Sequence, residues 1–343
     1  YEITTRLVGS EMCIRDRPET DMNSYDVTAL GELLIDFTQN GFSDQGNPIF
    51  EANPGGAPCN VLALLQKMGR KTAFIGKVGN DGFGNQLKGA LEETGISAEG
   101  LFMDGDVHTT LAIVQTKPDG DRDFSFYRRP GADMMLTEEQ IPEELIRNSR
   151  IFHYGTLSMT DEPVRSATRK AIAAAEEAGL VLSFDPNLRP PLWNTLEEAR
   201  EQIHYGLAHC HILKISDDEI TWLTNEEDYG KAAAAIRAQF PQIRLLLVSL
   251  GKEGSLAYYN DMEVCVKPFL HPDTIEMTGA GDTFMGSILH KVLEKGLDDL
   301  KAEDLTEMLT FANAAASLIT RKKGALRVMP EPEEIEAIIT TQI

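Results

Sequence analysis

The sequence contains few cysteines and no long apolar segment. Its four cysteines, Cys13, Cys59, Cys210 and Cys265, form no CxxC pair, which argues against a disulfide framework and favours reduced thiols. No run of about 18 consecutive apolar residues occurs, so a membrane-spanning helix is excluded. We therefore expect a cytoplasmic protein that has no membrane partner.

Basic residues are also in the minority. The chain has 32 Lys and Arg against 54 Asp and Glu, which gives a formal net charge of −22 at pH 7. Such a chain repels nucleic acid and anionic lipid, so neither is expected as a partner. An anionic ligand would need local features, such as backbone N–H groups and a few well-placed arginines.

Apolar residues make up 42% of the 343 residues, which is enough for one large α/β domain with an appendage, or for two domains. The first 21 residues fit neither description. They lack the apolar core of a signal peptide, and LVGSEMCIRDR resembles translated adaptor sequence. We expect residues 1–21 to be a non-native or disordered leader and Met22 to be the natural start.

Strand and helix patterns alternate along most of the chain. An apolar run at 25–37 predicts a first strand, and residues 57–68 have the apolar spacing of a helix. Later strand-like runs precede helices near 162–178 and 195–207. This alternation predicts parallel strands joined by crossover helices in an α/β sandwich.

Two segments break the alternation. The β-rich runs on either side of the turn PDGD predict a hairpin, and residues 38–54 are irregular. We interpret residues 37–56 and 108–130 as a small β-sheet lid on a main domain that extends over residues 25–340.

Polar residues follow the predicted strands. Asp36 ends the first strand, and the runs FDPN, KISDDE and SLGKEG end later ones. Open α/β sheets bind ligands beyond these carboxyl ends. The pattern favours an enzyme of phosphate or nucleotide chemistry, although the sequence contains no P-loop motif.

The segment Gly279-Ala280-Gly281-Asp282 opens a predicted helix. Free N–H groups at a helix N-terminus attract anions, and glycine lets a phosphate approach the backbone. In one interpretation, Asp282 only complements the helix dipole. In the other, the N–H groups hold a phosphoryl group in transfer, and Asp282 accepts the proton of the attacking hydroxyl.

Two longer segments resemble the signatures of the ribokinase-like (phosphofructokinase-B-type) carbohydrate kinase family. They are NPGGAPCNVLALLQKMGRKTAFIGKVGNDGFG and EMTGAGDTFMGSILHKVL. Four shorter segments, ALGELLIDFT, FYRRPGADMML, FDPNLRPPLW and FANAAASL, resemble its fructokinase branch. The resemblance runs from about residue 25 to about residue 330. It implies an ATP-dependent sugar kinase with a ribokinase-like three-layer α/β/α sandwich and a small β-sheet lid.

The resemblance also assigns roles to individual residues. It implies that Asp282 is the catalytic base and that the anion hole consists of Gly279, Ala280 and Gly281. The implied sugar-binding positions are Asp36, Gly55, Gly56, Asn60 and Arg128. A carboxylate and an amide can pair with adjacent hydroxyls, while the two glycines let the sugar approach the backbone. A strand-end cap for Asp36 and a tight turn for the glycines are the alternatives.

Arg128 is followed by Arg129 in a predicted lid strand. Successive strand residues face opposite ways, so only one of the two is expected to face the cleft. The family pattern favours Arg128, and a solvated surface charge is the alternative.

The implied nucleotide-binding positions are Asn187, Arg189, Ser216, Ser249, Gly251, Gly254 and Asn313. Ser216 stands where the family usually has asparagine, and its hydroxyl can still bond water or phosphate. For Asn313, the alternative is an ordinary polar position in a helix.

Two acidic residues are implied as metal ligands. Glu219 matches the residue that organises Mg²⁺ through water. Glu276 stands where an aspartate helps to hold a monovalent cation in some members, so it is a candidate K⁺ ligand. The implied cofactors are therefore ATP, Mg²⁺ and K⁺. By contrast, His209, Cys210 and His211 are expected in a strand, which places the two histidines on one face and Cys210 on the other. No third ligand lies at suitable spacing, so we expect no metal there.

These observations together predict a fructokinase that transfers a phosphoryl group from ATP to the 6-hydroxyl of D-fructose. Three alternatives remain. They are a 2-keto-3-deoxygluconate kinase that uses Arg128 and Arg129 as a cationic clamp, a nucleoside kinase, and a non-catalytic sugar- or nucleotide-binding regulator. Lid hairpins often pair between subunits in the family, so a homodimer is expected.

Overall fold

The computed structural model describes residues 24–116 and 122–342 of the chain. Two expected features lie outside the described residues. They are the leader of residues 1–21, together with the expected start at Met22, and the turn PDGD of the expected hairpin. Across the described ranges, no helix combines the length with the apolar character that a bilayer span would need.

The strands are β1 (Tyr25–Leu30), β2 (Leu34–Phe42), β3 (Pro48–Gly55), β4 (Thr72–Gly79), β5 (Ser97–Asp104), β6 (Leu111–Thr116), β7 (Arg122–Tyr127), β8 (Ser149–Gly155), β9 (Val181–Asp185), β10 (Ile212–Ser216), β11 (Leu245–Ser249), β12 (Ser255–Tyr259) and β13 (Met262–Val266). The α-helices are α1 (Ala57–Lys67), α2 (Gly82–Thr94), α3 (Glu143–Arg147), α4 (Val164–Glu177), α5 (Leu196–His209), α6 (Asp217–Thr224), α7 (Tyr229–Gln239), α8 (Ala280–Lys295), α9 (Ala302–Ile319) and α10 (Pro332–Gln342).

Nine strands form the main sheet in the order β13-β12-β11-β10-β9-β8-β1-β4-β5. The pairs from β11 to β5 are parallel, while β12 pairs antiparallel with both β11 and β13. The predicted parallel sheet with crossover helices is therefore confirmed.

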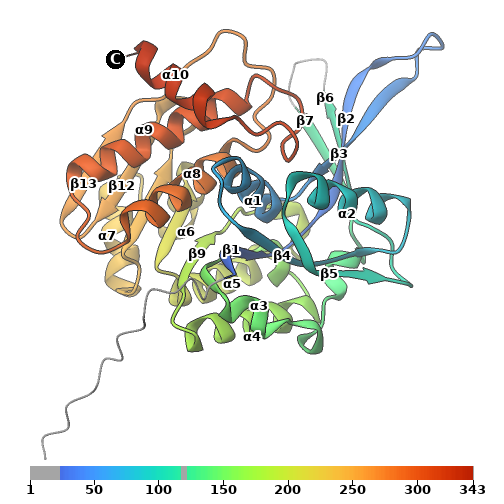
Figure 1. The fold of residues 1–343 in the computed structure, drawn as a ribbon, viewed down its shortest axis with the longest axis horizontal. Helices are drawn as coiled ribbons and strands as arrows, with labels where there is room; N and C mark the ends of the chain where they lie inside the picture. Colours follow the sequence, from blue (N-terminus) through green and yellow to red (C-terminus); the bar gives the residue numbers. More distant parts are fainter. Residues whose placement is uncertain (1–23, 117–121, 343) are drawn as a thin grey trace, which may run out of the picture.

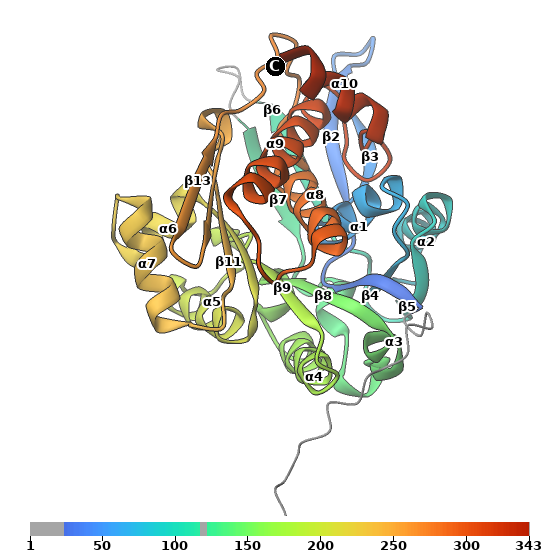
Figure 2. The same cartoon turned by 60° about the vertical axis from the view of Figure 1, so that its left-hand side comes forward.

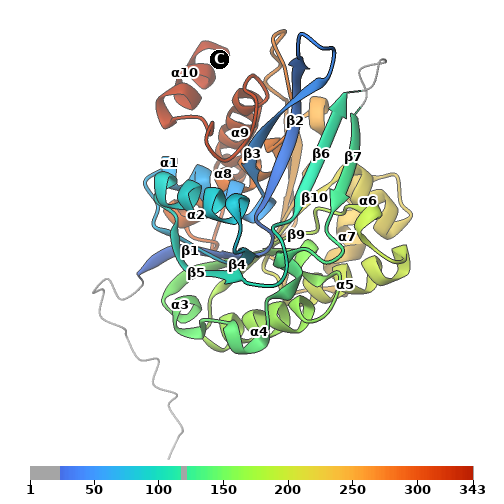
Figure 3. The same cartoon turned by 90° about the vertical axis from the view of Figure 1, so that its right-hand side faces the viewer.

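Helices cover both faces of this sheet (Figures 1 and 3). One buried cluster joins one face to α1, α2, α8 and α9, and a second joins the opposite face to α3, α4, α5, α6 and α7. Along β10, Ile212 belongs to the first cluster, whereas Leu213 and Ile215 belong to the second, as strand alternation requires. The predicted α/β/α sandwich is confirmed. Figure 2 shows α9 alongside α8, with α10 packed on α9.

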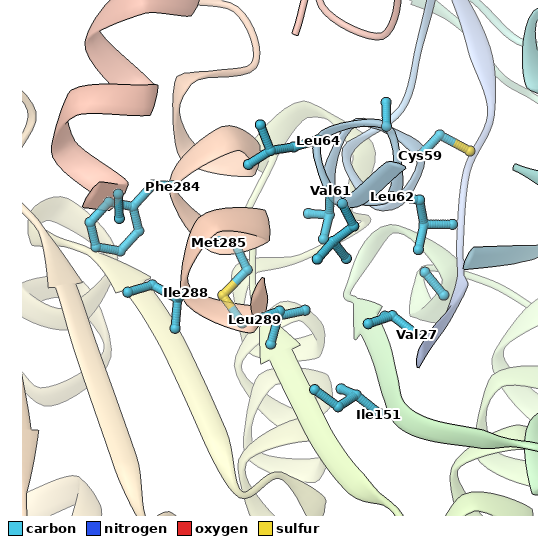
Figure 4. Packing of buried hydrophobic residues seen from close by; sticks show 14 of the residues in the cluster. Val27, Cys59, Val61, Leu62, Leu64, Ile151, Phe284, Met285, Ile288 and Leu289 are labelled. Atoms are coloured by element: carbon cyan, nitrogen blue, oxygen red, sulfur yellow. The ribbon is translucent and has the colours of Figure 1, made fainter. Parts of the chain in front are cut away.

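An apolar face fixes α8 to the sheet. Met285, Ile288 and Leu289 are fully buried, and their spacing places them on one side of the helix. Figure 4 shows Met285 and Leu289 near Val61 of α1 and Ile151 of the sheet. Each fully buried side chain of this size contributes about 1.5–3 kcal/mol relative to an exposed one. This packing fixes where the N-terminus of α8 lies.

A second, smaller sheet has the strand order β3-β2-β6-β7. Strands β6 and β7 pair antiparallel, which confirms the predicted hairpin, and β2 pairs antiparallel with β3 and parallel with β6. In Figure 3 this sheet rises away from the main sheet. Its strands overlap the two segments that were expected to form the lid.

The first expected strand, residues 25–37, is wrong as a single element. Strand β1 ends at Leu30 in the main sheet, and β2 begins at Leu34 in the small sheet. The chain bends at Gly31, which packs so tightly on α1 that a Cβ would meet Pro58 Cγ at 2.5 Å. An apolar run cannot reveal this bend, because a contact with a distant helix enforces it.

Two local expectations are also wrong. Asp36 does not end a main-sheet strand but pairs with Asn53 inside the small sheet. His209, Cys210 and His211 do not form a strand. His209 is the last residue of α5, Cys210 caps this helix, and His211 follows in the connection to β10.

Candidate active site

The N-terminus of α8 presents free hydrogen-bond donors. Gly279 precedes the helix in the left-handed conformation, with φ +78°, and the N–H of Thr283 donates to its carbonyl at 2.8 Å. Among the described residues, the backbone N–H groups of Gly281 and Asp282 have no acceptor. Two unpaired donors at the positive end of a helix dipole attract an anion.

Lys214 lies against this helix end. The residue is 6% exposed, and it belongs to the same face of β10 as Ile212, the face that α8 covers. A Cβ on Gly281 would meet Lys214 Nζ at 3.1 Å, so glycine lets the ammonium group approach the helix closely. Nζ also forms a 3.0 Å ion pair with Oδ2 of Asp185.

The carboxylate of Asp282 is held by an amide from α1. Asn60 donates from Nδ2 to Asp282 Oδ2 at 2.8 Å, while the buried Oδ1 of Asn60 has no partner among the described residues. Burial raises the pKa of Asp282 to about 6, and the nearby charge of Asp185 adds to the rise. The hydrogen bond from Asn60 works in the opposite direction. A carboxylate whose pKa lies near neutrality suits a general base.

Asp36 approaches the same place from the small sheet. Its carboxylate lies over Gly55, where a Cβ would be 2.2 Å from Asp36 Oδ2. Burial raises the pKa of Asp36 to about 7, and the negative charges of Glu276 and Asp282 add to the rise. Because the charge of Asp282 acts on Asp36, the expected sugar ligand Asp36 lies close to the expected base.

Gly56 serves the turn between β3 and α1. Its φ is +129°, and a Cβ would be 2.3 Å from the carbonyl oxygen of Glu32. The side chain of Glu32 then accepts a hydrogen bond from the N–H of Ala57 at 2.9 Å. These contacts support the tight-turn interpretation of Gly56, and its contact with a sugar stays a prediction.

A cavity of about 440 Å³ adjoins the start of α8. Ala280 and Gly281 line it together with five expected nucleotide-binding residues, which are Ser216, Ser249, Gly251, Gly254 and Asn313. A cavity of this size falls within the range of small-molecule sites. Residues from four distant parts of the sequence therefore meet in one cavity.

Asn313 also has a structural role. Its Nδ2 donates to the carbonyls of Val266 and Lys267, each at 3.2 Å, and its Oδ1 accepts from Ser255 Oγ at 3.0 Å. The side chain thus ties α9 to the ends of two strands. Its contact with adenine stays a prediction.

Ser216 and Glu219 form a capping box at the start of α6. Glu219 accepts from Ser216 N at 2.9 Å through Oε2 and from Leu188 N at 2.7 Å through Oε1. The carboxylate therefore fixes the loop after β9 to α6. Within the described residues, no three His, Cys, Asp or Glu side chains are grouped so that they could hold a metal by themselves.

The loop after β9 carries two further expected ligands. Asn187 adopts a left-handed conformation with φ +46°. Arg189 is exposed, and its charge lowers the pKa of both Asp36 and Asp282, so it lies close to both carboxylates. Neither residue lines the 440 Å³ cavity.

Arg128 is not presented as a free cation. It follows β7 and is 4% exposed, and its guanidinium pairs with Asp133 Oδ2 at 2.7 Å. It also donates to Thr160 Oγ1 at 3.0 Å and to the carbonyl of Leu157 at 2.7 Å. Arg128 lies just after the expected lid strand, not in it, and the alternative of a solvated surface charge is wrong, because a buried carboxylate binds the guanidinium. Direct sugar contact stays a prediction.

Lys214 belongs to the site but was not among the residues expected from the sequence. A lysine interrupts the otherwise apolar run 212–215 of a buried strand, and this was the available signal. A charge in such a place needs a partner or a function.

The three-layer sandwich, the second sheet and a carboxylate beside a free helix end define a class of small-molecule kinases. Residues 25–332 match the pfkB family of carbohydrate kinases, and the chain belongs to this family. It is therefore a sugar kinase, an enzyme that transfers a phosphoryl group to a sugar hydroxyl.

Similar proteins carry fructokinase names. The chain is 42% identical over 313 residues to fructokinase-2 of Solanum lycopersicum, covering 90% of this chain and 94% of the relative. It also resembles the fructokinase of Xylella fastidiosa with bound ATP, with a TM-score of 0.85, 29% identity, and coverage of 93% and 99%. A double-mutant fructokinase of Vibrio cholerae O395, in a form that binds fructose, ADP and potassium ion, gives a TM-score of 0.81 and 27% identity, with coverage of 92% and 99%.

Proposed function

We propose that the protein is a fructokinase that transfers the γ-phosphoryl group of ATP to the 6-hydroxyl of D-fructose. The observation that carries the proposal is the position of Asp282, which Asn60 holds beside the free N–H groups of α8. The fructokinase names of the similar proteins from Solanum lycopersicum, Xylella fastidiosa and Vibrio cholerae support the choice of sugar.

Each part of the helix end has a task in this reaction. Asp282 accepts the proton of the attacking hydroxyl, which its pKa of about 6 allows at neutral pH. The N–H groups of Gly281 and Asp282, with the helix dipole, stabilise the charge on the transferring phosphoryl group. The glycines keep this space free of side chains.

Polar groups on the opposite side receive the sugar. Asp36 can accept hydrogen bonds from adjacent hydroxyls, and the free Oδ1 of Asn60 is a further buried acceptor. Gly55 leaves room over the Asp36 carboxylate. The small sheet, with residues 37–56 and 108–130, closes over the sugar as a lid and excludes water.

We assign the 440 Å³ cavity to the nucleotide. Magnesium, when bound with the nucleotide, supplies positive charge that neutralises the phosphates. The group that suits its water shell is Glu219, whose carboxylate accepts from the loop after β9 and from the start of α6. Glu276, which is buried and close to Asp36, is the proposed ligand for a monovalent cation, and the potassium of the Vibrio cholerae neighbour supports this choice.

A neutral sugar suits the site better than an acidic one. A keto-acid sugar would need a cationic clamp, but Arg128 is buried and paired with Asp133. Arg129 is exposed at the end of the hairpin. The carboxylates of Asp36 and Asp282 would repel an acidic substrate.

The test is ADP release by the purified full chain with fructose, 2-keto-3-deoxygluconate, ribose or adenosine, in magnesium and potassium. The Asp282→Asn variant is measured in parallel, with Asp299→Asn as the control, because Asp299 is exposed and its left-handed conformation also accommodates asparagine. We expect turnover with fructose that Asp282→Asn abolishes and Asp299→Asn retains. Turnover with only another substrate overturns the choice of sugar, and sugar binding without turnover favours a non-catalytic regulator.

We further propose that the protein is a cytoplasmic homodimer whose small sheets pair. Phe42 and Tyr127 are 67% and 62% exposed on this sheet, and large exposed apolar side chains favour an interface. The double variant Phe42→Ser/Tyr127→Ser should be a monomer where the wild type is a dimer. Light scattering measures the molar mass of both. A wild-type monomer at micromolar concentration would contradict the proposal.

A further inference from the structure

The main sheet contains a charged pair beside the α8 N-terminus that the proposed reaction has not yet used. Lys214 on β10 and Asp185 at the end of β9 are 6% and 3% exposed, and they form a 3.0 Å ion pair. Among the described residues, Asp185 Oδ2 is the hydrogen-bond acceptor of Lys214, so two of its three ammonium hydrogens remain available. Burying the charges of Lys214 and Asp185 costs free energy, so a functional role for the pair is a reasonable hypothesis to examine.

The position of Lys214 points to that function. Its Nζ lies so close to Gly281 that a Cβ there would come within 3.1 Å. The unpaired N–H groups of Gly281 and Asp282 belong to the same helix turn. An ammonium group and two backbone donors therefore share one small region.

The surrounding charges make this cation necessary for an anionic substrate. Asp185, Glu219 and Asp282 all lie near Lys214 and raise its pKa, so the side chain stays charged. His153, which bonds to Ser183 Oγ at 2.9 Å, has its pKa lowered to about 3 by burial and by Lys214, so it adds no positive charge at neutral pH. Without Lys214, a phosphoryl group would meet several carboxylates, and the cation that still acts on Asp282 among the described residues would be the exposed Arg189.

We infer that Lys214 is a catalytic residue whose ammonium group contacts the transferring phosphoryl group, and that Asp185 positions it. The inference rests on the proposed function. The sugar oxygen forms a bond to phosphorus while the bond from phosphorus to the ADP oxygen breaks. The hydroxyl proton passes to Asp282, and Lys214 keeps its own protons throughout.

The first test compares Lys214→Met with the wild type, using whichever sugar the wild type accepts. Loss of a charge that stabilises the transition state should lower kcat by about 100-fold or more, while KM for the sugar stays within about threefold. The control is Lys291→Met. Lys291 is also a nearly buried lysine, and it lies in α8 itself, paired with Glu294 and Glu307. Because it lies three turns along the helix from the site, its loss should leave kcat unchanged.

The double variant Lys214→Met/Asp185→Asn separates catalysis from a structural ion pair. It removes both charges, so a merely structural pair would leave kcat within about threefold of the wild type once the imbalance is relieved. That recovery would overturn the inference. We expect the melting temperature to recover and kcat to stay low.

A binding measurement keeps the inference testable if no sugar supports turnover. The dissociation constant is measured by calorimetry for MgADP alone and for MgADP with beryllium fluoride, a mimic of the phosphoryl group. Lys214→Met should weaken the fluoride complex by about tenfold or more and change MgADP alone by less than about twofold. Equal affinities in the wild type and the variant would overturn the inference, whereas absent sugar turnover alone would count only against the proposed function.

Discussion

Asn60 donates a 2.8 Å hydrogen bond from Nδ2 to Oδ2 of Asp282, and this bond joins the first turns of α1 and α8 across 222 residues of sequence. The amide favours the charged carboxylate and so opposes the burial that raises the pKa of Asp282 to about 6. The packing of two helices therefore controls the protonation of the proposed base.

Replacing Asn60 with leucine should move the pH dependence of kcat. The variant loses the bond that lowers the pKa of Asp282, so this pKa rises by about one unit or more. Because the base must be deprotonated, activity below about pH 7 should fall further in the variant than activity at pH 8.5. The measurement is kcat from pH 5 to pH 8.5, since kcat reports groups in the substrate complex. Gln66→Leu, at the other end of α1, is the control, and an unshifted Asn60→Leu profile would contradict the assignment of the base.

Gly281→Ala should separate stability from activity. Alanine is favoured over glycine inside a helix by up to about 1 kcal/mol, but the new Cβ would meet Lys214 Nζ at 3.1 Å and occupy the space proposed for the phosphoryl group. We expect an unchanged or slightly raised melting temperature and a fall in kcat of about tenfold or more. In Gly89→Ala on α2, the Cβ meets no atom within 4 Å. That control should gain stability and keep full activity. Equal activity in the two variants would contradict the assignment of the phosphoryl site to the N-terminus of α8.

Glu32→Gln should stabilise the protein in a pH-dependent way. Burial raises the pKa of Glu32 from 4.5 to about 7. The unfolded chain therefore releases this proton at lower pH than the folded protein does, and stability falls as the pH rises from about 4.5 to about 7. Glutamine can still accept the hydrogen bond from Ala57 and has no proton to lose.

The expected gain in unfolding free energy for Glu32→Gln is of the order of 3 kcal/mol at pH 8 and close to zero at pH 4. Urea denaturation at the two pH values measures it. Glu99→Gln, at an exposed position of β5, should show no such dependence. A gain that is the same at both pH values would mean that the pKa of Glu32 is the same in the folded and the unfolded protein.

Local patterns predicted much of this molecule because their causes are local. The apolar spacing of α8 and the glycines at its ends were readable, as was the hairpin of β6 and β7. The break after Leu30 was not readable, because it depends on contact between Gly31 and Pro58. Lys214 was missed for the same kind of reason: the backbone that it approaches, at Gly281, is 67 positions further along the chain.

The resemblance to a family predicted which residues would gather, and the structure adds how each is held. Ser216, Ser249 and Asn313 do meet in one cavity. The motif could not indicate that Asn313 already bonds two strand ends or that Glu219 fixes the loop before α5. Arg128 differs most, because its partner Asp133 lies within the same FYRRPGADMML motif and binds it in the interior.

Substitutions at Arg128 can therefore distinguish a role in stabilising the fold from a role in binding the sugar. Its guanidinium and Asp133 form a 2.7 Å pair in the interior, and Thr110 also donates to that carboxylate. Arg128→Met leaves a buried carboxylate without its cation, which should cost about 3–5 kcal/mol of unfolding free energy. Adding Asp133→Leu removes the stranded charge and should recover much of that loss. We expect KM for the sugar in the double variant to stay within about threefold of the wild type. Urea denaturation and steady-state kinetics on the same preparations measure both quantities. A KM that rises by tenfold or more at unchanged stability would instead support sugar binding by Arg128, because only a residue that contacts the substrate weakens its binding without weakening the fold.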